Sequence, residues 1–516
     1  MVGDVARTTG EDAIAHDRAA SLPLSMRRLV LAATGMLVLQ LAWILAIPAF
    51  GGIDEFDHAY RAASVARGEW APRPVDATRG TGAWVHVPAS FVDAARPECQ
   101  LLKYTTDADC VGTRTGDTVR IATGAGRYHP LFYAIIGYPS LPFHGEAALY
   151  AMRAANAVLC SALFLLGLLA MRRWARSAWA YAGAIAACTP VVLYSTAIAS
   201  PNGSEMLAAF AFWSSLIGLV TAAPAAIARR VDGSLLAIAT TSGVLLATIR
   251  SLGPLFCVLI AVTVLITCPA PVARVRELIR TRSVQVASTI LVLAAIGSVV
   301  WIETMKALVV GTEPTRAVTL GDKLSTTAGF LPLWLFQSIA AFPFRDQPSP
   351  ALVYVLVLAI GVTVVVQALR TGGHRNRIAM ITAVLLSGGV PFVISLGTID
   401  QHAGAWQGRY GLPYSLGLLL LAGQALDSRP RGPHRLLIAG AATFTAIATY
   451  VALSRVLDIE RGVSPSYASG AWNAPSAILV LSLALVGAGL MWSVAADLGA
   501  DSAEDRQNPL PAAAHH

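Results

Sequence analysis

The chain has 516 residues, of which 55% are hydrophobic and 13% charged, with a mean hydropathy of +0.60. Soluble domains carry about 25% charged residues, so this composition excludes an ordinary soluble enzyme, a disordered chain and a fibrous repeat, and it indicates a multi-pass membrane protein. The 38 Lys and Arg against 30 Asp and Glu leave a net charge of +8, which in a membrane protein reports the orientation of the loops rather than a nucleic-acid partner.

Apolar runs that could cross a bilayer recur along the whole chain, and each crossing needs about 20 residues. The expected fold is therefore an all-α integral membrane protein with about twelve transmembrane helices. The predicted spans are 29–49, 147–171, 177–198, 205–227, 234–250, 253–269, 284–304, 351–369, 378–398, 411–426, 435–454 and 474–496. The fifth and sixth are short, and the apolar, proline-containing segment 329–344 is expected to be interfacial or re-entrant.

Arginine clusters occupy alternate loops, which places all of them on one side if there are twelve spans. They are Arg27 and Arg28; Arg172, Arg173 and Arg176; Arg229 and Arg230; Arg274, Arg276, Arg280 and Arg282; Arg370, Arg375 and Arg377; and Arg429, Arg431 and Arg435. The positive-inside rule makes that side cytoplasmic. We therefore expect a polar cytoplasmic N-terminus at 1–28, a membrane domain at 29–496 and a disordered cytoplasmic tail at 497–516, in the cytoplasmic membrane of a bacterium.

The first outside loop, 50–146, is too long to be structureless. It has a helical pattern at 54–68, short strand-like runs around Trp84 to Val87, and an apolar, aromatic run that should lie against the membrane. Cys99 and Cys110 share this loop, and an oxidising compartment favours a disulfide between them over two free thiols. The other cysteines fall in or beside spans, and no zinc-ligand spacing occurs.

The motif directly after the first span runs from Asp54 through Glu55 and His58 to Arg61. On a helix, Asp54 and His58 are neighbours at positions i and i+4. A carboxylate at the lipid–water boundary is partly desolvated, which raises its basicity and suits it to remove a proton from a hydroxyl. The alternative is a solvated helix start, where acids favour the positive end of the helix dipole.

Two arginines lie on the outer side, where the positive-inside trend least expects them. Arg250 follows the fifth span and Arg409 precedes the tenth. A guanidinium binds phosphate in a bidentate manner, so each is a candidate ligand for an anionic group, with snorkelling to headgroups as the alternative. Tyr410, beside Arg409, could stack on a sugar or belong to the interfacial aromatic belt.

Further polar groups are predicted at the same interface. Asn202 and Glu205 place an amide and a carboxylate at the start of the fourth span, although a simple tight turn explains them equally well. Arg153 lies near the outer end of the second span. Acids and arginines from distant parts of the chain thus gather at the outer interface, an arrangement that suits a lipid-phosphate substrate.

Several motifs resemble domain-of-unknown-function family 2142 of bacterial multi-pass proteins, and they span residues 50–420 in the family's order. They are Asp54-Glu55-x-x-His58-x-x-Arg61, Gly68, Tyr128-His129-Pro130-Leu131-Phe132-Tyr133, Arg153-x-x-Asn156, Ser200-Pro201-Asn202 and Gln407-Gly408-Arg409-Tyr410 with Pro413. The family usually has Asp where this chain has Asn202. We therefore predict no metal site. A metal ion bound at this position would have to use Asn202 and Glu205 as its ligands.

The family resembles the GT-C class of membrane glycosyltransferases, which take a sugar from a polyprenyl-phosphate donor outside the cytoplasmic membrane. The resemblance implies a GT-C-like fold whose long first exoplasmic loop forms interfacial helices. It also implies an inverting transferase that acts on a cell-envelope glycan or lipid acceptor, with Asp54 or Glu55 as general base and His58 tuning the acid. Expected contacts to substrate are Arg409, Tyr410, Gln407, Arg250, Arg61, Arg153, Asn202, Tyr128 and His129.

The resemblance leaves several points open. No cofactor is required, and a divalent Mg or Mn ion is compatible with the class. The residues do not select a sugar, although an arabinofuranosyl donor for an actinobacterial cell-wall polysaccharide would fit. Alternative functions are a transporter or flippase for lipid-linked sugars, which should carry charges deep in its spans and an internal repeat, and a non-catalytic scaffold for envelope polysaccharide assembly.

Overall fold

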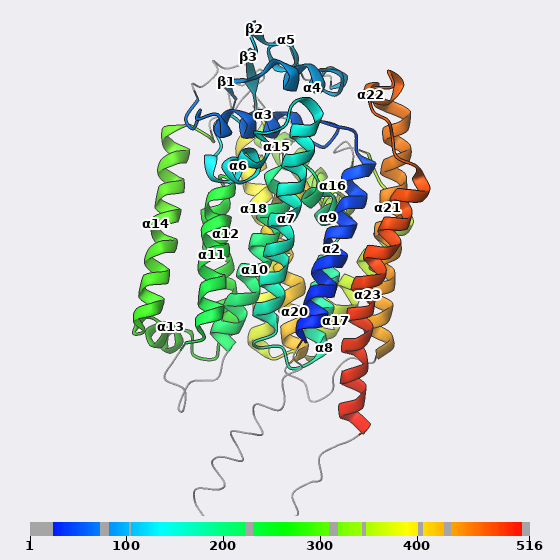
Figure 1. The fold of residues 1–516 in the computed structure, drawn as a ribbon. Helices are drawn as coiled ribbons and strands as arrows, with labels where there is room; N and C mark the ends of the chain where they lie inside the picture. The colour runs from blue at the N-terminus through cyan, green and yellow to red at the C-terminus, as the bar shows by residue number, and fades with distance from the viewer. Residues whose placement is uncertain are drawn as a thin grey trace, which may run out of the picture.

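The computed structural model describes residues 24–72, 82–102, 105–221, 231–308, 318–342, 347–400, 406–427 and 435–507. Within this part, long helices form a bundle, and a small subdomain with a sheet covers one end of it (Figure 1). The N-terminal start of α2 and the C-terminal end of α23 both lie at the end opposite this subdomain.

Eight helices in the described residues are long and apolar enough to cross a membrane. They are α2 (Met26–Ala46), α7 (Gly145–Met171), α10 (Pro201–Thr221), α14 (Arg282–Thr304), α17 (Ala351–Thr371), α18 (His374–Thr398), α21 (Arg435–Val463) and α23 (Ala477–Gln507). Two bent pairs raise the number to ten if each pair is one span. They are α8 (Ala178–Ala187) with α9 (Pro190–Ala197), bent by 66°, and α12 (Gly253–Thr267) with α13 (Pro271–Ile279), bent by 119°.

The predicted count of twelve spans is not confirmed, because two predicted spans form helices that are too short. The fifth is α11 (Gly233–Ile249), and the tenth is divided into η2 (Gly408–Gly411), α19 (Leu412–Ser415) and α20 (Gly417–Asp427). The 11 residues of α20 rise about 16 Å, whereas the hydrocarbon core is about 30 Å thick. The last helix also differs, since α23 continues past the predicted end at 496 to Gln507.

The first long loop forms the cap, which we define as β1 (Ala83–Pro88), α4 (Ala89–Leu101), α5 (Asp107–Cys110), β2 (Thr113–Thr115) and β3 (Thr118–Thr123). Its three strands are antiparallel in the order β1-β3-β2. The predicted disulfide joins Cys99 to Cys110. The predicted helix at 54–68 is α3 (Glu55–Ala66), which lies between the sheet and the bundle (Figure 1). The chain returns through α6 (Pro130–Gly137) and η1 (Tyr138–Ser140) into α7.

The first and last long helices pack side by side (Figure 1). A Cβ atom on Gly487 of α23 would lie 2.9 Å from the carbonyl oxygen of Gly35 on α2, so these glycines allow the two backbones to approach closely. The short helix α22 (Pro465–Ala468) connects α21 to α23, and we call these three helices the C-terminal hairpin. Ser464 Oγ and Ser466 N–H donate to Glu98 of α4 at 2.6 and 3.2 Å, so α22 joins this hairpin to the cap. The C-terminal hairpin therefore stabilises both the first helix and the cap.

Two further predictions concern the remaining helices. The apolar segment at 329–344 forms α16 (Leu331–Ala340), which follows α15 (Leu320–Gly329), and neither is long enough to be a span. The basic helix α13 lies at the end opposite the cap (Figure 1), where the arginine pattern predicts the cytoplasm. Arg229, Arg230, Arg429 and Arg431 and residues 1–23 and 508–516 lie outside the described residues.

Candidate active site

A polar cavity of about 150 Å³ lies where α3, the end of the cap sheet and the helical bundle meet. Its walls come from five segments of the chain that are far apart in sequence. The lining residues are Asp54, Asp57, His58, Gly124, Ala125, Tyr128, Asn202, Arg250 and Tyr410. Six of the twelve predicted catalytic and substrate-binding residues line it, namely Asp54, His58, Tyr128, Asn202, Arg250 and Tyr410, and we call this space the polar cavity.

A second, mostly apolar cavity of about 210 Å³ adjoins the polar cavity, and the two share Tyr128, Arg250 and Tyr410. Its other lining residues are Glu205, Ser251, Leu252, Phe256, Ala307, Leu308, Ile394, Ser395, Thr398 and Trp406. We call it the apolar cavity. The guanidinium of Arg250 therefore borders both a cavity that contains Asp54 and Asp57 and a mostly apolar cavity that contains Glu205.

Asp54 lies at the sharp turn that redirects the chain from α2 into α3. Its φ of 56° is in the left-handed region, which Asp tolerates better than most residues. Its Oδ2 accepts a hydrogen bond from Arg409 Nη2 at 2.5 Å, and the Asp54 side chain is 30% exposed while that of Arg409 is 5% exposed. The proposed acid and the proposed phosphate ligand are therefore one ion pair at the edge of the polar cavity.

The glycine of the Gln407-Gly408-Arg409-Tyr410 motif explains how Arg409 is fixed. Gly408 N–H donates to Gln337 Oε1 of α16 at 2.8 Å. A Cβ atom on Gly408 would lie 1.9 Å from the carbonyl oxygen of Trp334, so only glycine fits against α16. Gln407 is buried beside it, and its Oε1 accepts no hydrogen bond from the described residues.

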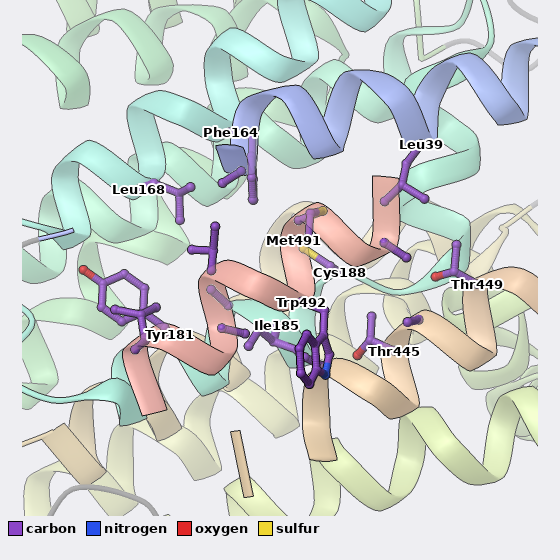
Figure 2. A pocket seen from close by; sticks show the side chains of 18 of the residues that line it. Leu39, Phe164, Leu168, Tyr181, Ile185, Cys188, Thr445, Thr449, Met491 and Trp492 are labelled. Carbon is purple, nitrogen blue, oxygen red and sulfur yellow. The ribbon is translucent and has the colours of Figure 1, made fainter. Parts of the chain in front are cut away.

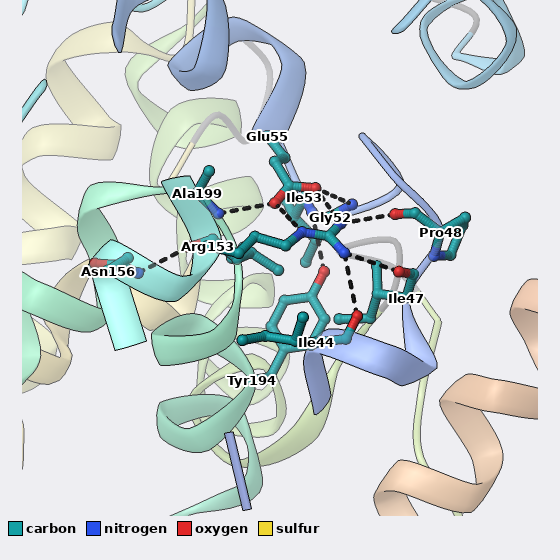
Figure 3. Close-up of polar contacts among 11 residues, drawn as sticks. Ile44, Ile47, Pro48, Gly52, Ile53, Glu55, Arg153, Asn156, Tyr194 and Ala199 are labelled. Carbon is teal, nitrogen blue, oxygen red and sulfur yellow. Dashed lines mark hydrogen bonds and ion pairs between the residues drawn. The ribbon is translucent and has the colours of Figure 1, made fainter. Parts of the chain in front are cut away.

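Glu55 and Arg153 form a fully buried ion pair, as Figure 3 shows. Arg153 donates from Nε and Nη2 to the two carboxylate oxygens at 2.8 and 2.6 Å, and both side chains are 0% exposed. The remaining Arg153 donors bind the carbonyl oxygens of Ile44, Ile47 and Pro48 at the end of α2. The carboxylate also accepts from Gly52 N–H and Ala199 N–H. This pair ties α2, α3, α7 and the start of α10 together, and both carboxylate oxygens already have partners.

Asn202 and Glu205, at the start of α10, both contact Arg250. Arg250 Nη1 donates to Asn202 Oδ1, and its Nε lies 3.9 Å from Glu205 Oε2. The guanidinium carbon also lies 4.2 Å from the centroid of the Tyr410 ring, a distance that allows a cation–π contact. Asn202 and Glu205 therefore orient Arg250 between the two cavities. No group of three or more His, Cys, Asp or Glu that could hold a metal occurs among the described residues.

His58 is a neutral hydrogen-bonding group. Its Nδ1 lies 2.8 Å from Tyr133 Oη, and its ring stacks with those of Tyr128 and Tyr133. Burial lowers the pKa of His58 to about 3; the charge of Asp54 opposes the shift, and those of Arg250 and Arg409 add to it. The imidazole therefore carries no charge near neutral pH, so it affects the site through hydrogen bonding and shape.

Arg61 and His129, both predicted substrate contacts, hold backbone in place. Arg61 is fully buried and donates to the carbonyl oxygens of Glu69, Trp70 and Tyr128. His129 is the N-cap of α6, where its Nδ1 accepts from Leu131 N–H at 3.3 Å. Both residues support the wall on which Tyr128 lies, and neither lines the polar cavity.

The sequence patterns assigned no site role to Asp57, although it belongs to the same motif. It lines the polar cavity, and its Oδ1 accepts from Gly124 N–H at 2.6 Å. Its carbonyl oxygen accepts from Thr123 Oγ1 at 2.7 Å. Only the folding of β3 back over α3 creates these contacts, so helical spacing alone could not reveal them.

A third cavity, of about 100 Å³, lies on the side of the bundle between α2, α7, α8, α21 and α23. Figure 2 shows that apolar side chains such as Leu39, Phe164, Ile185 and Met491 make up most of its wall. Its lining contains no Asp, Glu, His, Lys or Arg.

Fold and site together define a multi-pass helical membrane protein whose first long loop covers a charged cavity beside an apolar one. A family model described as "predicted membrane protein (DUF2142)" matches residues 37–418, and the chain belongs to this family. The sequence-based resemblance to family 2142 is therefore confirmed. A search of curated proteins found no match.

Two solved structures resemble the chain, both of ArnT from Cupriavidus metallidurans. The apo structure is 15% identical, with a TM-score of 0.45, and the match covers 92% of this chain and 76% of that one. The structure bound to undecaprenyl phosphate is 14% identical, with a TM-score of 0.44, and the match covers 93% and 78%.

Proposed function

We propose that the protein is a GT-C-like membrane glycosyltransferase that transfers a sugar from a polyprenyl-phosphate donor to a hydroxyl of a cell-envelope glycan or lipid. One observation carries the proposal, namely that Arg250 stands between a cavity lined by Asp54 and Asp57 and a cavity lined by apolar side chains. A prenyl chain fits the apolar cavity by the hydrophobic effect, the phosphate fits the guanidinium, and a sugar fits the carboxylate-lined cavity.

In the proposed reaction, the Asp54 carboxylate removes the proton from the acceptor hydroxyl. The hydroxyl oxygen attacks the anomeric carbon, and the bond from that carbon to the phosphate oxygen breaks, with inversion. The polyprenyl phosphate leaves with the electron pair, and Arg250 and Arg409 stabilise the charge on it. Asp54 is preferred to Glu55 because it is 30% exposed at the cavity, whereas Glu55 is 0% exposed and bound on both oxygens.

Orientation follows from the same proposal. The cap, the polar cavity and Arg409 lie at one end of the bundle, and the basic helix α13 lies at the other. The positive-inside rule then places the active site on the exoplasmic face of a bacterial cytoplasmic membrane and both termini in the cytoplasm.

The test uses the full chain in proteoliposomes with a panel of radiolabelled polyprenyl-phosphate sugars and envelope acceptors. The wild type should form a labelled glycan, and Asp54→Asn should lose about 10²-fold or more of this activity. The matched control is Asp93→Asn on α4, which changes a half-exposed Asp of the cap outside both cavities. Full activity of Asp54→Asn would overturn the assignment of the base. Movement of lipid-linked sugar across the bilayer without a new glycosidic bond would favour a transporter instead.

A further inference from the structure

The proposed base and one proposed phosphate ligand are bound to each other in this structure. Arg409 Nη2 lies 2.5 Å from Asp54 Oδ2. A carboxylate beside a guanidinium is a weak base, because the positive charge favours its deprotonated form. An arginine whose charge a carboxylate already balances also attracts a phosphate less strongly. In this arrangement neither residue is ready for its proposed role.

We propose that the donor phosphate and Asp54 compete for Arg409, so that binding of the donor releases the carboxylate that acts as the base. This inference rests on the proposed function and concerns the regulation of the same site. It predicts ordered binding, with the donor first, because an acceptor that arrives earlier meets a carboxylate paired with Arg409.

The surroundings of the pair indicate which partner moves. Arg409 is 5% exposed, and the neighbouring Gly408 is fixed against α16. Asp54 is 30% exposed and lines the polar cavity, so its side chain has space to turn toward an acceptor. The exchange therefore needs a rotation of one short side chain and leaves the guanidinium in place.

We place the donor phosphate beside Tyr410. The guanidinium carbons of Arg250 and Arg409 lie 4.2 and 5.2 Å from the centroid of this one ring. Both arginines are therefore close to the same side chain. In addition, Arg409 Nε is buried and has no hydrogen-bond partner among the described residues, which leaves a donor for an incoming anion.

The experiment measures equilibrium binding of undecaprenyl phosphate, without a sugar, to the purified full chain in nanodiscs. Asp54→Asn should bind this lipid about tenfold more tightly than the wild type, because the competing charge is gone. Asp57→Asn is the matched control, since it removes the same charge from the same cavity and leaves the partner of Arg409 intact. Its affinity for the lipid should rise about twofold or less, from long-range electrostatics alone. Arg409→Gln should bind more weakly than the wild type.

The outcomes separate this inference from the proposed function. Equal gains in Asp54→Asn and Asp57→Asn, or no gain in either, would refute the competition while leaving the proposed function in place. Absence of saturable binding by the wild type would refute both. Asp54→Ser serves as a second variant if Asp54→Asn does not fold, with the thermal unfolding midpoint as the criterion of folding.

Discussion

Replacing Glu55 by Gln should destabilise the protein and leave the proposed chemistry unchanged, although Glu55 is next to the proposed base. Glu55 and Arg153 are both 0% exposed, and removal of one member of such a buried pair costs about 3–5 kcal/mol because the other charge is left unpaired. A glutamine also has one carbonyl oxygen for the two N–H groups, of Gly52 and Ala199, that the carboxylate accepts from. A loss of about 4 kcal/mol is a large part of the 5–15 kcal/mol by which proteins are typically stable.

The assay compares Glu55→Gln with Asp54→Asn in the same detergent, using the free energy of unfolding from a denaturant titration and the transfer activity of the folded fraction. Asp54→Asn leaves Arg409, which is 5% exposed, without its partner and should cost about 1–3 kcal/mol, while transfer falls about 10²-fold or more. Glu55→Gln should lose stability, and its folded fraction should retain transfer. A stable Glu55→Gln protein without activity would show that Glu55 takes part in the reaction and that our division of roles is wrong.

Three further outcomes are expected. The free energy of unfolding should fall as the pH is lowered from 6.5 toward 3, because His58 binds a proton in the unfolded chain and not in the folded protein. In denaturant titrations at a series of pH values, His58→Asn should reduce the slope of this free energy against pH. In Gly408→Ala, the new Cβ atom would lie 1.9 Å from the Trp334 carbonyl oxygen, so the free energy of unfolding should fall by about 1–3 kcal/mol. The variant should also transfer sugar more slowly, because Arg409 is displaced. Transfer kinetics equal to those of the wild type would contradict this. Cys99→Ser with Cys110→Ser should destabilise the cap by about 2–3 kcal/mol, measured by hydrogen exchange in β1 and α4, whereas unchanged exchange would show that the disulfide adds nothing.

The sequence predicts the helical class well because hydrophobicity over a long window is a strong and local signal. It does not predict span number equally well. The apolar run around α20 is a normal candidate by composition, yet the chain there forms η2, α19 and α20 in place of one long helix, with Pro413 in the first turn of α19. The length of a helix depends on such local breaks, and the hydropathy of a sequence window does not report them.

The residues of the candidate site, like the spans, could be predicted only in part from the sequence. Asp54, Arg250 and Arg409 could be found because charges at a membrane boundary need a physical reason. Their partners could not, since Asn202 meets Arg250 and Asp57 meets Gly124 only after the chain folds. Sequence alone favoured Asp54 as the base and left Glu55 open as its rival. Burial separates them, because Arg153 approaches Glu55 from a helix about a hundred positions later in the chain.

The close packing of α2 against α23 gives the C-terminal hairpin a supporting role. The family model ends at residue 418, before this hairpin, which covers α2 and holds the cap through Glu98. The hairpin contributes no lining residue to the polar or the apolar cavity. It therefore supports the candidate site from outside, through its contacts with the first long helix and with the cap.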